Sequence, residues 1–367
     1  MPLSQRTLNR TLLTRQHLLH RAGPATTAEG VVAHLLGMQS QVPSSPYPGL
    51  WSRLDGFDVA ELGRLLTERR VVRLAMMRST VHLVTARDAL GLRPWLAPML
   101  RRSFANSQWA KGLAGVDEAA LTAEGRALLR EKPRTPAELR AALAPRFPAA
   151  DPAALVHALR SWLPLVQLPP RGVWGANGGT TYGLLDEWLG AEQARAAQPA
   201  DSADVVRRYL AAFGPAAPAD LQKWSGLTGL KSAFSGLDLR TYTAEDGREL
   251  YDLPDAELTD SDVPVTARFV ADFDNVLLAH ADRTRIVPEA HRSRVMTVNG
   301  IVRGTILVDG FVAGTWRFAR AKGTAAVEVT HFAPLSAADR TSLTSEALRL
   351  LATTDPEATP EVTFTAG

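Results

Sequence analysis

Three copies of one pattern, helix, helix, helix and then strands, constrain the fold of this chain more than any other feature. In the first copy, apolar residues at helical spacing predict helices over 8–21 and 59–70, and a helix between them begins at a capping box of Thr26 and Glu29. Residues 73–85 then combine β-branched and long apolar side chains, which is typical of strands joined by a turn.

The second and third copies carry their own boundary signals. The second begins at Thr135 and Glu138, a capping box with proline at the first helical position. The third ends in a hairpin whose turn is Asp246-Gly247. Helices followed by a hairpin form the winged-helix pattern, a relative of the helix-turn-helix. One copy is weak support because short helices beside a hairpin are common, whereas three in tandem favour a nucleic-acid-binding protein.

The last third of the chain has a different character. After a polar linker at 255–264, the dipeptides Asn299-Gly300 and Asp309-Gly310 lie between alternating runs and predict an antiparallel sheet that is curled or closed. A C-terminal helix follows. The expected fold class is therefore α+β, with three tandem winged-helix domains and a C-terminal antiparallel, β-barrel-like domain. The expected domain boundaries are 1–125, 126–190, 191–257 and 258–367.

Charge is unevenly distributed, although the whole chain has a net charge of only +3. Residues 1–110 contain fourteen arginines, no lysine and six acidic residues, a net charge of +8, whereas the remaining residues have a net charge of −5. A basic region suits a polyanionic partner, and the guanidinium fork binds two phosphate oxygens at once. A general preference for arginine over lysine in the whole chain explains why the basic residues here are arginines. It does not explain why residues 1–110 contain so few acidic residues.

Several classes of protein are disfavoured by what the sequence lacks. It has no cysteine, which excludes disulfides, iron–sulfur clusters and thiolate zinc sites. No apolar run approaches the roughly 20 residues of a membrane-spanning helix, and the first residues lack the apolar core of a signal peptide. Phosphate-binding glycine loops and histidines at metal spacing are also missing. We therefore expect a cytoplasmic protein without a metal site or a membrane partner.

Two groups of charged residues are candidates for binding or chemistry. Arg78, Thr80 and His82 would share one face of a strand, and this face is either a half-buried strand edge or a phosphate contact. Asp272 and Asp274 could bind a divalent cation or act as acid and base, but an ion-paired turn is favoured because arginines follow closely. These arginines form a second predicted basic patch, which consists of Arg283, Arg285, Arg292 and Arg294.

Two glutamines, Gln39 and Gln41, flank Ser40 in the stretch LLGMQSQVPSSPYPGLWSRL. Side chains two positions apart share one face of an extended chain but diverge on a helix. Pro43 disfavours helical geometry at Val42, so the preceding helix should end near the glutamines and both amides could face one cleft. On spacing alone, polar residues at the end of a helix are the simpler interpretation.

Further motifs accompany the glutamines in a fixed order. GMQSQ is followed by MMRSTVHLVTARDAL, LPPRGVWG, RRYLAAFGPAAPADLQKWSGL, DGRELYDLPDA, FDNVLLAHADRTRIV and ILVDGFVAGTW. Together these stretches resemble the winged-helix DNA glycosylases of the AlkZ/YcaQ type over nearly the whole chain. The resemblance implies three tandem winged helices and a β-barrel-like domain, arranged as a C-shaped clamp on duplex DNA. It also implies that Gln39 and Gln41 are catalytic, because the family motif is glutamine, any residue, then glutamine or aspartate.

The Gln–Gln form of the motif is similar to that of bacterial self-resistance glycosylases for bulky alkylating antibiotics. One departure is Ser40, at a position that is usually apolar in the family. The resemblance implies a monomeric enzyme that uses water and no cofactor to hydrolyse the N-glycosidic bond of bulky N7-alkylguanine adducts, with interstrand crosslinks as an additional candidate. Residues 1–110 also lack a lysine that could form a Schiff base, which predicts base release without strand cleavage.

The partner implied by the resemblance is double-stranded DNA that carries an alkylated guanine. A DNA-facing wing and the second basic patch would grip this duplex. A winged-helix regulator that binds DNA without catalysis is the alternative function. The expected DNA-contacting residues are Arg78, Ser79, Thr80 and His82 on the wing, and Arg283, Arg285, Arg292 and Arg294 in the patch.

Overall fold

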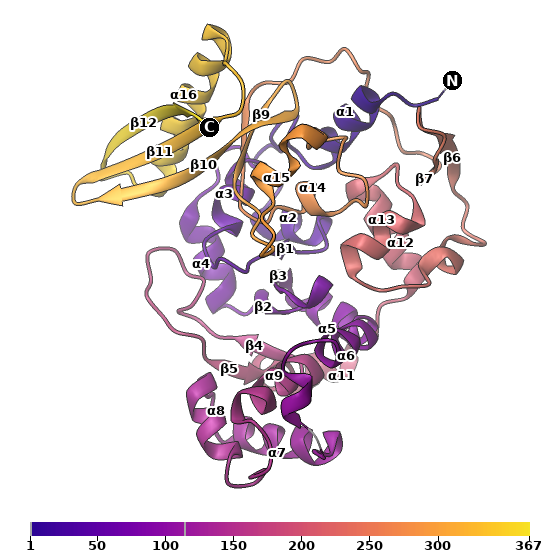
Figure 1. The fold of residues 1–367 in the computed structure, drawn as a ribbon, viewed down its shortest axis with the longest axis vertical. Coiled ribbons are helices and arrows are strands. Elements are labelled where there is room, and N and C mark those ends of the chain that lie inside the picture. Colours follow the sequence, from indigo (N-terminus) through magenta and orange to yellow (C-terminus); the bar gives the residue numbers. More distant parts are fainter. Residues whose placement is uncertain (1, 114) are drawn as a thin grey trace.

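The computed structural model describes residues 2–113 and 115–367. Its elements are arranged around two five-stranded sheets and one two-stranded hairpin (Figure 1). The N-terminal third lies at the centre, a mostly helical unit extends to the bottom of the view, and the C-terminal sheet lies at the upper left. No helix within these residues is both long and apolar enough to cross a bilayer.

The first sheet joins strands from the first two copies of the predicted pattern. It consists of β1 (Met38–Gln39), β2 (Val71–Ala75), β3 (Val81–Thr85), β4 (Leu165–Gln167) and β5 (Tyr182–Leu184). The order is β1-β3-β2-β4-β5, and every neighbouring pair is antiparallel. The strands predicted as separate wings therefore form one continuous sheet.

The helices of the N-terminal unit depart from the prediction at two boundaries. The first helix was expected to reach residue 21 but ends at Arg15, because His17 adopts a positive φ of 54°. The second helix is capped by Thr27, one residue later than predicted, since the Thr27 hydroxyl accepts a hydrogen bond from the backbone of Gly30 at 3.1 Å. The helices are α1 (Gln5–Arg15), α2 (Ala28–His34), α3 (Pro46–Trp51), α4 (Val59–Thr67), α5 (Ala86–Trp95) and α6 (Ala97–Ala105), with a 3-10 turn, η1 (Met77–Ser79), between β2 and β3.

The second unit has an apolar core of its own. The predicted capping box is confirmed, because the Thr135 hydroxyl accepts from the backbone of Glu138 and the Glu138 carboxylate accepts from the backbone of Thr135. Leu121, Leu139 and Leu155, one from each long helix, are fully buried together. The elements are η2 (Ala110–Leu113), α7 (Glu118–Glu131), α8 (Pro136–Leu143), α9 (Pro152–Trp162), α10 (Leu185–Leu189) and α11 (Ala191–Ala196).

The third unit contains the hairpin predicted at Asp246-Gly247. Gly247 has a positive φ of 83°, and β6 pairs antiparallel with β7 around it. The N-terminal segment lies against this hairpin, because Leu3 forms a parallel bridge with Ala244. The elements are α12 (Ser202–Phe213), α13 (Pro218–Ser225), η3 (Leu230–Phe234), β6 (Arg240–Thr243) and β7 (Glu249–Asp252).

The C-terminal sheet is open and mixed, so the prediction of an antiparallel, barrel-like sheet was wrong. It contains β8 (Arg268–Val270), β9 (Thr305–Val308), β10 (Phe311–Ala321), β11 (Thr324–His331) and β12 (Thr359–Ala366) in the order β12-β11-β10-β9-β8. The two ends of this order do not pair with each other. The helix α16 (Ala337–Thr354) connects β11 to β12 as a crossover, so β12 returns parallel to β11. Shorter helices are α14 (Asn275–Leu278), η4 (Glu289–His291) and α15 (Arg292–Val295).

One apolar cluster ties three of the units together. It contains Leu12 of α1, Leu74 of β2, Tyr209 of α12, Trp224 of α13 and Leu277 of α14, all at most 1% exposed. Burial of large side chains in a shared core fixes the units relative to one another, because separating them would expose this apolar area to water. The N-terminal, third and C-terminal units thus hold a common frame around the first sheet.

Candidate active site

The segment that carries the two glutamines is an edge strand fixed by its neighbours. Gly37 has a positive φ of 104°, and a Cβ atom on it would lie 2.5 Å from a methyl carbon of Val84. Only glycine fits this conformation and this approach. The Asn275 side chain donates to the Gly37 carbonyl at 2.8 Å, and the following residues pair with β3 so that Gln39 lies opposite His82. The chain is extended at the motif, as predicted, although the preceding helix already ends at His34.

The middle residue of the motif, Ser40, is fully buried and holds a buried cation. Arg73 of β2 is 2% exposed, and it donates from Nε to the Ser40 hydroxyl at 2.9 Å and from Nη2 to the Ser40 carbonyl at 2.8 Å. Burial lowers the pKa of Arg73 to about 10, and the nearby charge of Arg171 acts in the same direction. The side chain remains charged at neutral pH, so it clamps the backbone between the two glutamines with charge-assisted hydrogen bonds.

Gln39 is 6% exposed, and its amide oxygen accepts from Arg78 Nη2 at 2.9 Å. The other terminal nitrogen of Arg78 donates to the carbonyl of Trp224 in α13 at 2.5 Å. Because a guanidinium has only donors, the oxygen of the Gln39 amide faces Arg78 and the NH2 group faces away. Burial and the charge of Arg283 lower the pKa of Arg78 to about 10.

Gln41 is exposed, and its amide oxygen accepts from the backbone of Val81 at 3.2 Å. The same residue of β3 accepts a backbone hydrogen bond from Ser40 at 2.8 Å. The Gln39 amide thus contacts the turn before β3, and the Gln41 amide contacts the first residue of β3. Their bonds leave the second lone pair of each oxygen and both NH2 groups for other partners.

His82 is fully buried, and both of its ring nitrogens have partners within the protein. Nδ1 lies 3.1 Å from the Thr80 carbonyl and Nε2 lies 3.4 Å from Arg78 Nη2. Burial lowers the pKa of His82 to about 3, and the charge of Arg78 adds to the effect. The structure thus brings Arg78, Thr80 and His82 together, as predicted, but places His82 behind Arg78 rather than on an open face. Ser79, the remaining residue of the predicted wing, is half-buried, and its carbonyl accepts from Arg160.

The second predicted patch is only partly at the surface. Arg292 is exposed and lies 3.5 Å from Glu289, whereas Arg283 is half-buried, with Nη1 near the sulfur of Met296. Arg294 is also half-buried, and its guanidinium lies 4.1 Å from the ring centroid of Phe332. The structure separates Arg285 from this group. It is 3% exposed, and its Nη1 donates to the Pro215 carbonyl at 3.0 Å.

A lysine that sequence analysis missed joins the glutamine site to this patch. Lys223 of α13 is largely exposed, but partial burial of its ammonium group lowers its pKa, and the charges of Arg283, Arg78 and Arg292 act in the same direction. This group of four cations spans η1, α13, the segment between α14 and η4, and the first residue of α15. The stretch LQKWSGL was part of the family resemblance, but nothing local in it indicates that Lys223 lies near these arginines.

One of the two aspartates is ion-paired, but not with the arginines that follow it, from which the pairing was predicted. Both carboxylate oxygens of Asp274 accept from Arg53 at 2.8 Å, and both side chains are buried. Asp272 accepts from the backbone of Gly304 at 2.8 Å. In the described parts of the chain, no three acidic, histidine or cysteine side chains are grouped as metal ligands would be.

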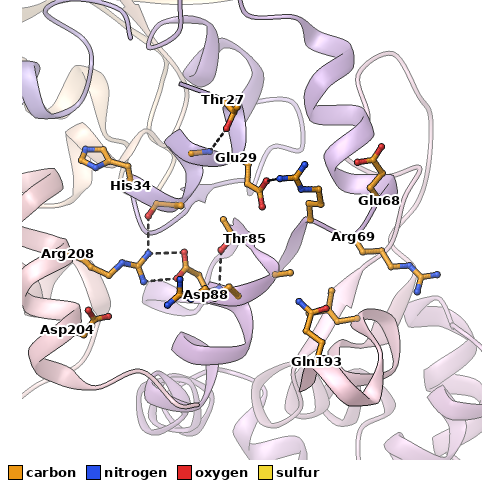
Figure 2. Close-up of a pocket in the computed structure, with 16 residues that line it drawn as sticks. Thr27, Glu29, His34, Glu68, Arg69, Thr85, Asp88, Gln193, Asp204 and Arg208 are labelled. Atoms are coloured by element: carbon orange, nitrogen blue, oxygen red, sulfur yellow. Dashed lines mark hydrogen bonds and ion pairs between the residues drawn. The ribbon is translucent and has the colours of Figure 1, made fainter. Parts of the chain in front are cut away.

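A cavity of about 860 Å³ lies at the opposite end of β3, where Thr85 caps α5 (Figure 2). Four of its charged side chains form ion pairs: Arg208 donates to both oxygens of Asp88 at 2.7 and 2.9 Å, and Arg70 pairs with Glu29. None of the residues predicted for catalysis or DNA binding lines it. We therefore locate the candidate site at the glutamines rather than in this cavity.

Comparison with known proteins identifies the family and the fold. A family model described as DNA glycosylase AlkZ-like matches residues 32–353, which is most of the chain. The protein is a DNA glycosylase, an enzyme that removes bases from DNA. The chain belongs to the AlkZ-like DNA glycosylase family.

Comparisons of sequence and of structure both lead to Streptomyces sahachiroi. A protein named interstrand DNA cross-link repair glycosylase is 29% identical over 326 residues, which are 83% of this chain and 85% of the relative. The solved structure of the DNA glycosylase AlkZ superposes with a TM-score of 0.82 at 22% identity and covers all of both chains. At this identity the superposition shows that the two proteins share a mixed α+β fold.

Proposed function

We propose that the protein hydrolyses the N-glycosidic bond of bulky N7-alkylguanine adducts and that Gln39 and Gln41 form its catalytic centre. The observation that carries this proposal is the pair of amides held against η1 and β3, next to a cluster of cations that suits DNA phosphates. Family membership supports base excision as the reaction. The adduct class rests on the Gln–Gln form of the motif.

The chemistry suits neutral side chains. Alkylation at N7 puts a positive charge on the guanine, so the base departs readily and leaves an oxocarbenium-like sugar. What remains is to hold a water molecule on the opposite face of the sugar and to stabilise its charge, which depends on positioning and electrostatics more than on a strong base. In this proposal the exposed amide of Gln41 holds the water through the free lone pair of its oxygen, and Gln39 is oriented beside it.

The proposed partner is duplex DNA, whose phosphates contact Lys223 and Arg283, Arg292 and Arg294 of the predicted patch. The relative from S. sahachiroi is named for interstrand cross-link repair, which supports crosslinks as additional substrates here. Protection of a bacterial cell from a genotoxic natural product is the corresponding biological role. We propose that the enzyme acts as a cytoplasmic monomer and releases the base without cutting the strand.

The test compares Gln41→Ala with Gln193→Ala, a matched change of an exposed glutamine that lies away from the motif. Released base is measured by mass spectrometry from a duplex with a single N7-alkylguanine, at enzyme excess, and binding is measured by fluorescence anisotropy. Gln41→Ala should lower the excision rate by about 100-fold or more with nearly unchanged binding, because the amide acts in the transition state. Gln193→Ala should behave as the wild type.

The double variant Gln39→Ala, Gln41→Ala decides the site. Full activity of this variant would remove both glutamines from catalysis. If the wild type releases no base but binds particular undamaged sequences with high selectivity, the protein is a regulator, and the glycosylase proposal for this motif is wrong.

A further inference from the structure

The turn next to the motif has an unusual backbone. Arg78 and Ser79 in η1 have φ values of 55° and 60°, so two successive residues with side chains occupy the left-handed region. Residues other than glycine rarely adopt this conformation. Such conformations persist where the surrounding structure holds them, and they gather at functional sites.

Three units of the protein hold this turn in place. Arg160 of α9 donates to the Ser79 carbonyl at 3.1 Å. Gly226, just after α13, approaches so closely that a Cβ atom on it would lie 3.3 Å from the Arg78 backbone. Within the N-terminal unit, the Thr80 hydroxyl donates to the Met77 carbonyl at 3.1 Å. The turn is therefore determined by contacts from the second and third units as well as its own.

The fork of Arg78 connects the third unit to a proposed catalytic amide. One terminal nitrogen donates to the Trp224 carbonyl, and the other lies 2.9 Å from Gln39 Oε1 and 3.4 Å from His82 Nε2. His82 is neutral, and donation from Nδ1 to the Thr80 carbonyl leaves Nε2 as an acceptor that faces Arg78. Each acceptor around Arg78 therefore favours the same orientation of the guanidinium.

We infer that Arg78 is a positioning residue that sets the orientation of the Gln39 amide and links it to the third unit. The terminal torsion of glutamine is broad and nearly two-fold, so an unrestrained amide exchanges its oxygen and nitrogen by rotation. Arg78 can donate only to the oxygen of the amide and thereby selects one of the two orientations. The effect on excision rests on the proposed function of Gln39, whereas the orientation itself does not.

This role differs from that of a phosphate contact, which the sequence predicted for Arg78. A phosphate contact requires charge, which lysine retains, whereas the positioning role requires two donors in a fixed fork, which lysine lacks. Arg78→Lys and the uncharged Arg78→Met separate the two roles. Both replacements keep an unbranched, mostly apolar stem in the space that Arg78 occupies.

The kinetic test is a double-mutant cycle between Arg78→Met and Gln39→Ala, measured as single-turnover excision above spontaneous depurination. In the wild-type background Arg78→Met should lower the rate constant by about 10- to 100-fold at saturating enzyme, since a misplaced group loses its contribution. In the Gln39→Ala background the same change should have no further effect. Arg78→Lys, which keeps the charge, should bind DNA as the wild type does but excise as slowly as Arg78→Met. Equal losses in both backgrounds, or full rescue by lysine, would overturn the inference.

A second measurement requires no activity. In the ¹H–¹⁵N spectrum, the side-chain amide of Gln39, assigned as the pair of signals lost in Gln39→Ala, should be well dispersed in the wild type. In Arg78→Met it should move toward the positions of a free glutamine, while the backbone spectrum stays dispersed and so shows that the variant is folded. Unchanged Gln39 signals in Arg78→Met would refute the positioning role, whether or not the wild type releases a base. Failure of the wild type to release a base would by itself count only against the proposed function.

Discussion

The clamp between Ser40 and Arg73 predicts that a single hydroxyl in the motif contributes to stability. Ser40 is fully buried, and its hydroxyl accepts from Arg73 Nε at 2.9 Å. Nη1 of Arg73 already has no hydrogen-bond partner within the described residues. Ser40→Ala would leave a second nitrogen of a buried cation without an acceptor. Hydrogen bonds to charged groups contribute about 1.5–3 kcal/mol, so we expect the free energy of unfolding to fall by this amount.

Urea denaturation followed by circular dichroism and by tryptophan fluorescence measures the change. Ser44→Ala is the matched control, because Ser44 is exposed and lies four residues further along the same segment. It should change the free energy of unfolding by less than about 0.5 kcal/mol. Ser40→Thr, which keeps a hydroxyl, tests whether the acceptor or the volume of the side chain matters. The excision rate should fall with Ser40→Ala, since the backbone between the two glutamines loses one of its two bonds to Arg73.

Two outcomes would contradict this reasoning. If Ser40→Ala and Ser44→Ala unfold at the same urea concentration as the wild type, the bond to the Ser40 carbonyl alone satisfies Arg73. If Ser40→Ala is more stable than the wild type, an apolar residue is preferred at this position, as is usual in the family, and the clamp does not stabilise the protein.

Three further predictions concern DNA binding, the nucleophile and pH. Replacing Arg292 and Arg294 with alanine should reduce the slope of the logarithm of the DNA-binding constant against the logarithm of the salt concentration by up to about 2. An unchanged slope in an anisotropy titration would exclude both residues from the interface. Borohydride added to the enzyme and the adducted duplex should trap no covalent complex. A band that disappears in Lys223→Arg would instead assign a Schiff-base mechanism to Lys223. Because burial lowers the pKa of His82 from 6.5 to about 3, the unfolded state binds the proton more tightly, so stability should be lost as pH falls from about 6.5 to 3. His82→Asn should reduce this loss of stability without removing it, since the pKa of His280 is also lowered to about 3. If the variant and the wild type show the same dependence of stability on pH, His82 titrates normally.

Local patterns in the sequence predicted the elements and the motif. Periodic apolar residues, the capping box at Thr135 and the turn at Asp246-Gly247 act over a few residues, so they can be read without knowledge of the fold. Pro43 similarly indicated an extended chain at the glutamines. Assignment of Gln39 and Gln41 as a site came from the order of motifs along the chain, because spacing alone favoured a polar helix end.

The tertiary structure decided which distant residues complete these local features. Asp274 pairs with Arg53, which is 221 positions away in the sequence, rather than with the arginines that follow it. The Trp224 carbonyl accepts from Arg78, which is 146 positions away. No local pattern encodes such a pair, because it depends on how separate units pack around a common core. The same holds for the open C-terminal sheet. A hairpin signal fixes one turn, but whether the sheet closes depends on α16, whose crossover makes β12 run parallel to β11 and leaves the sheet with two edges.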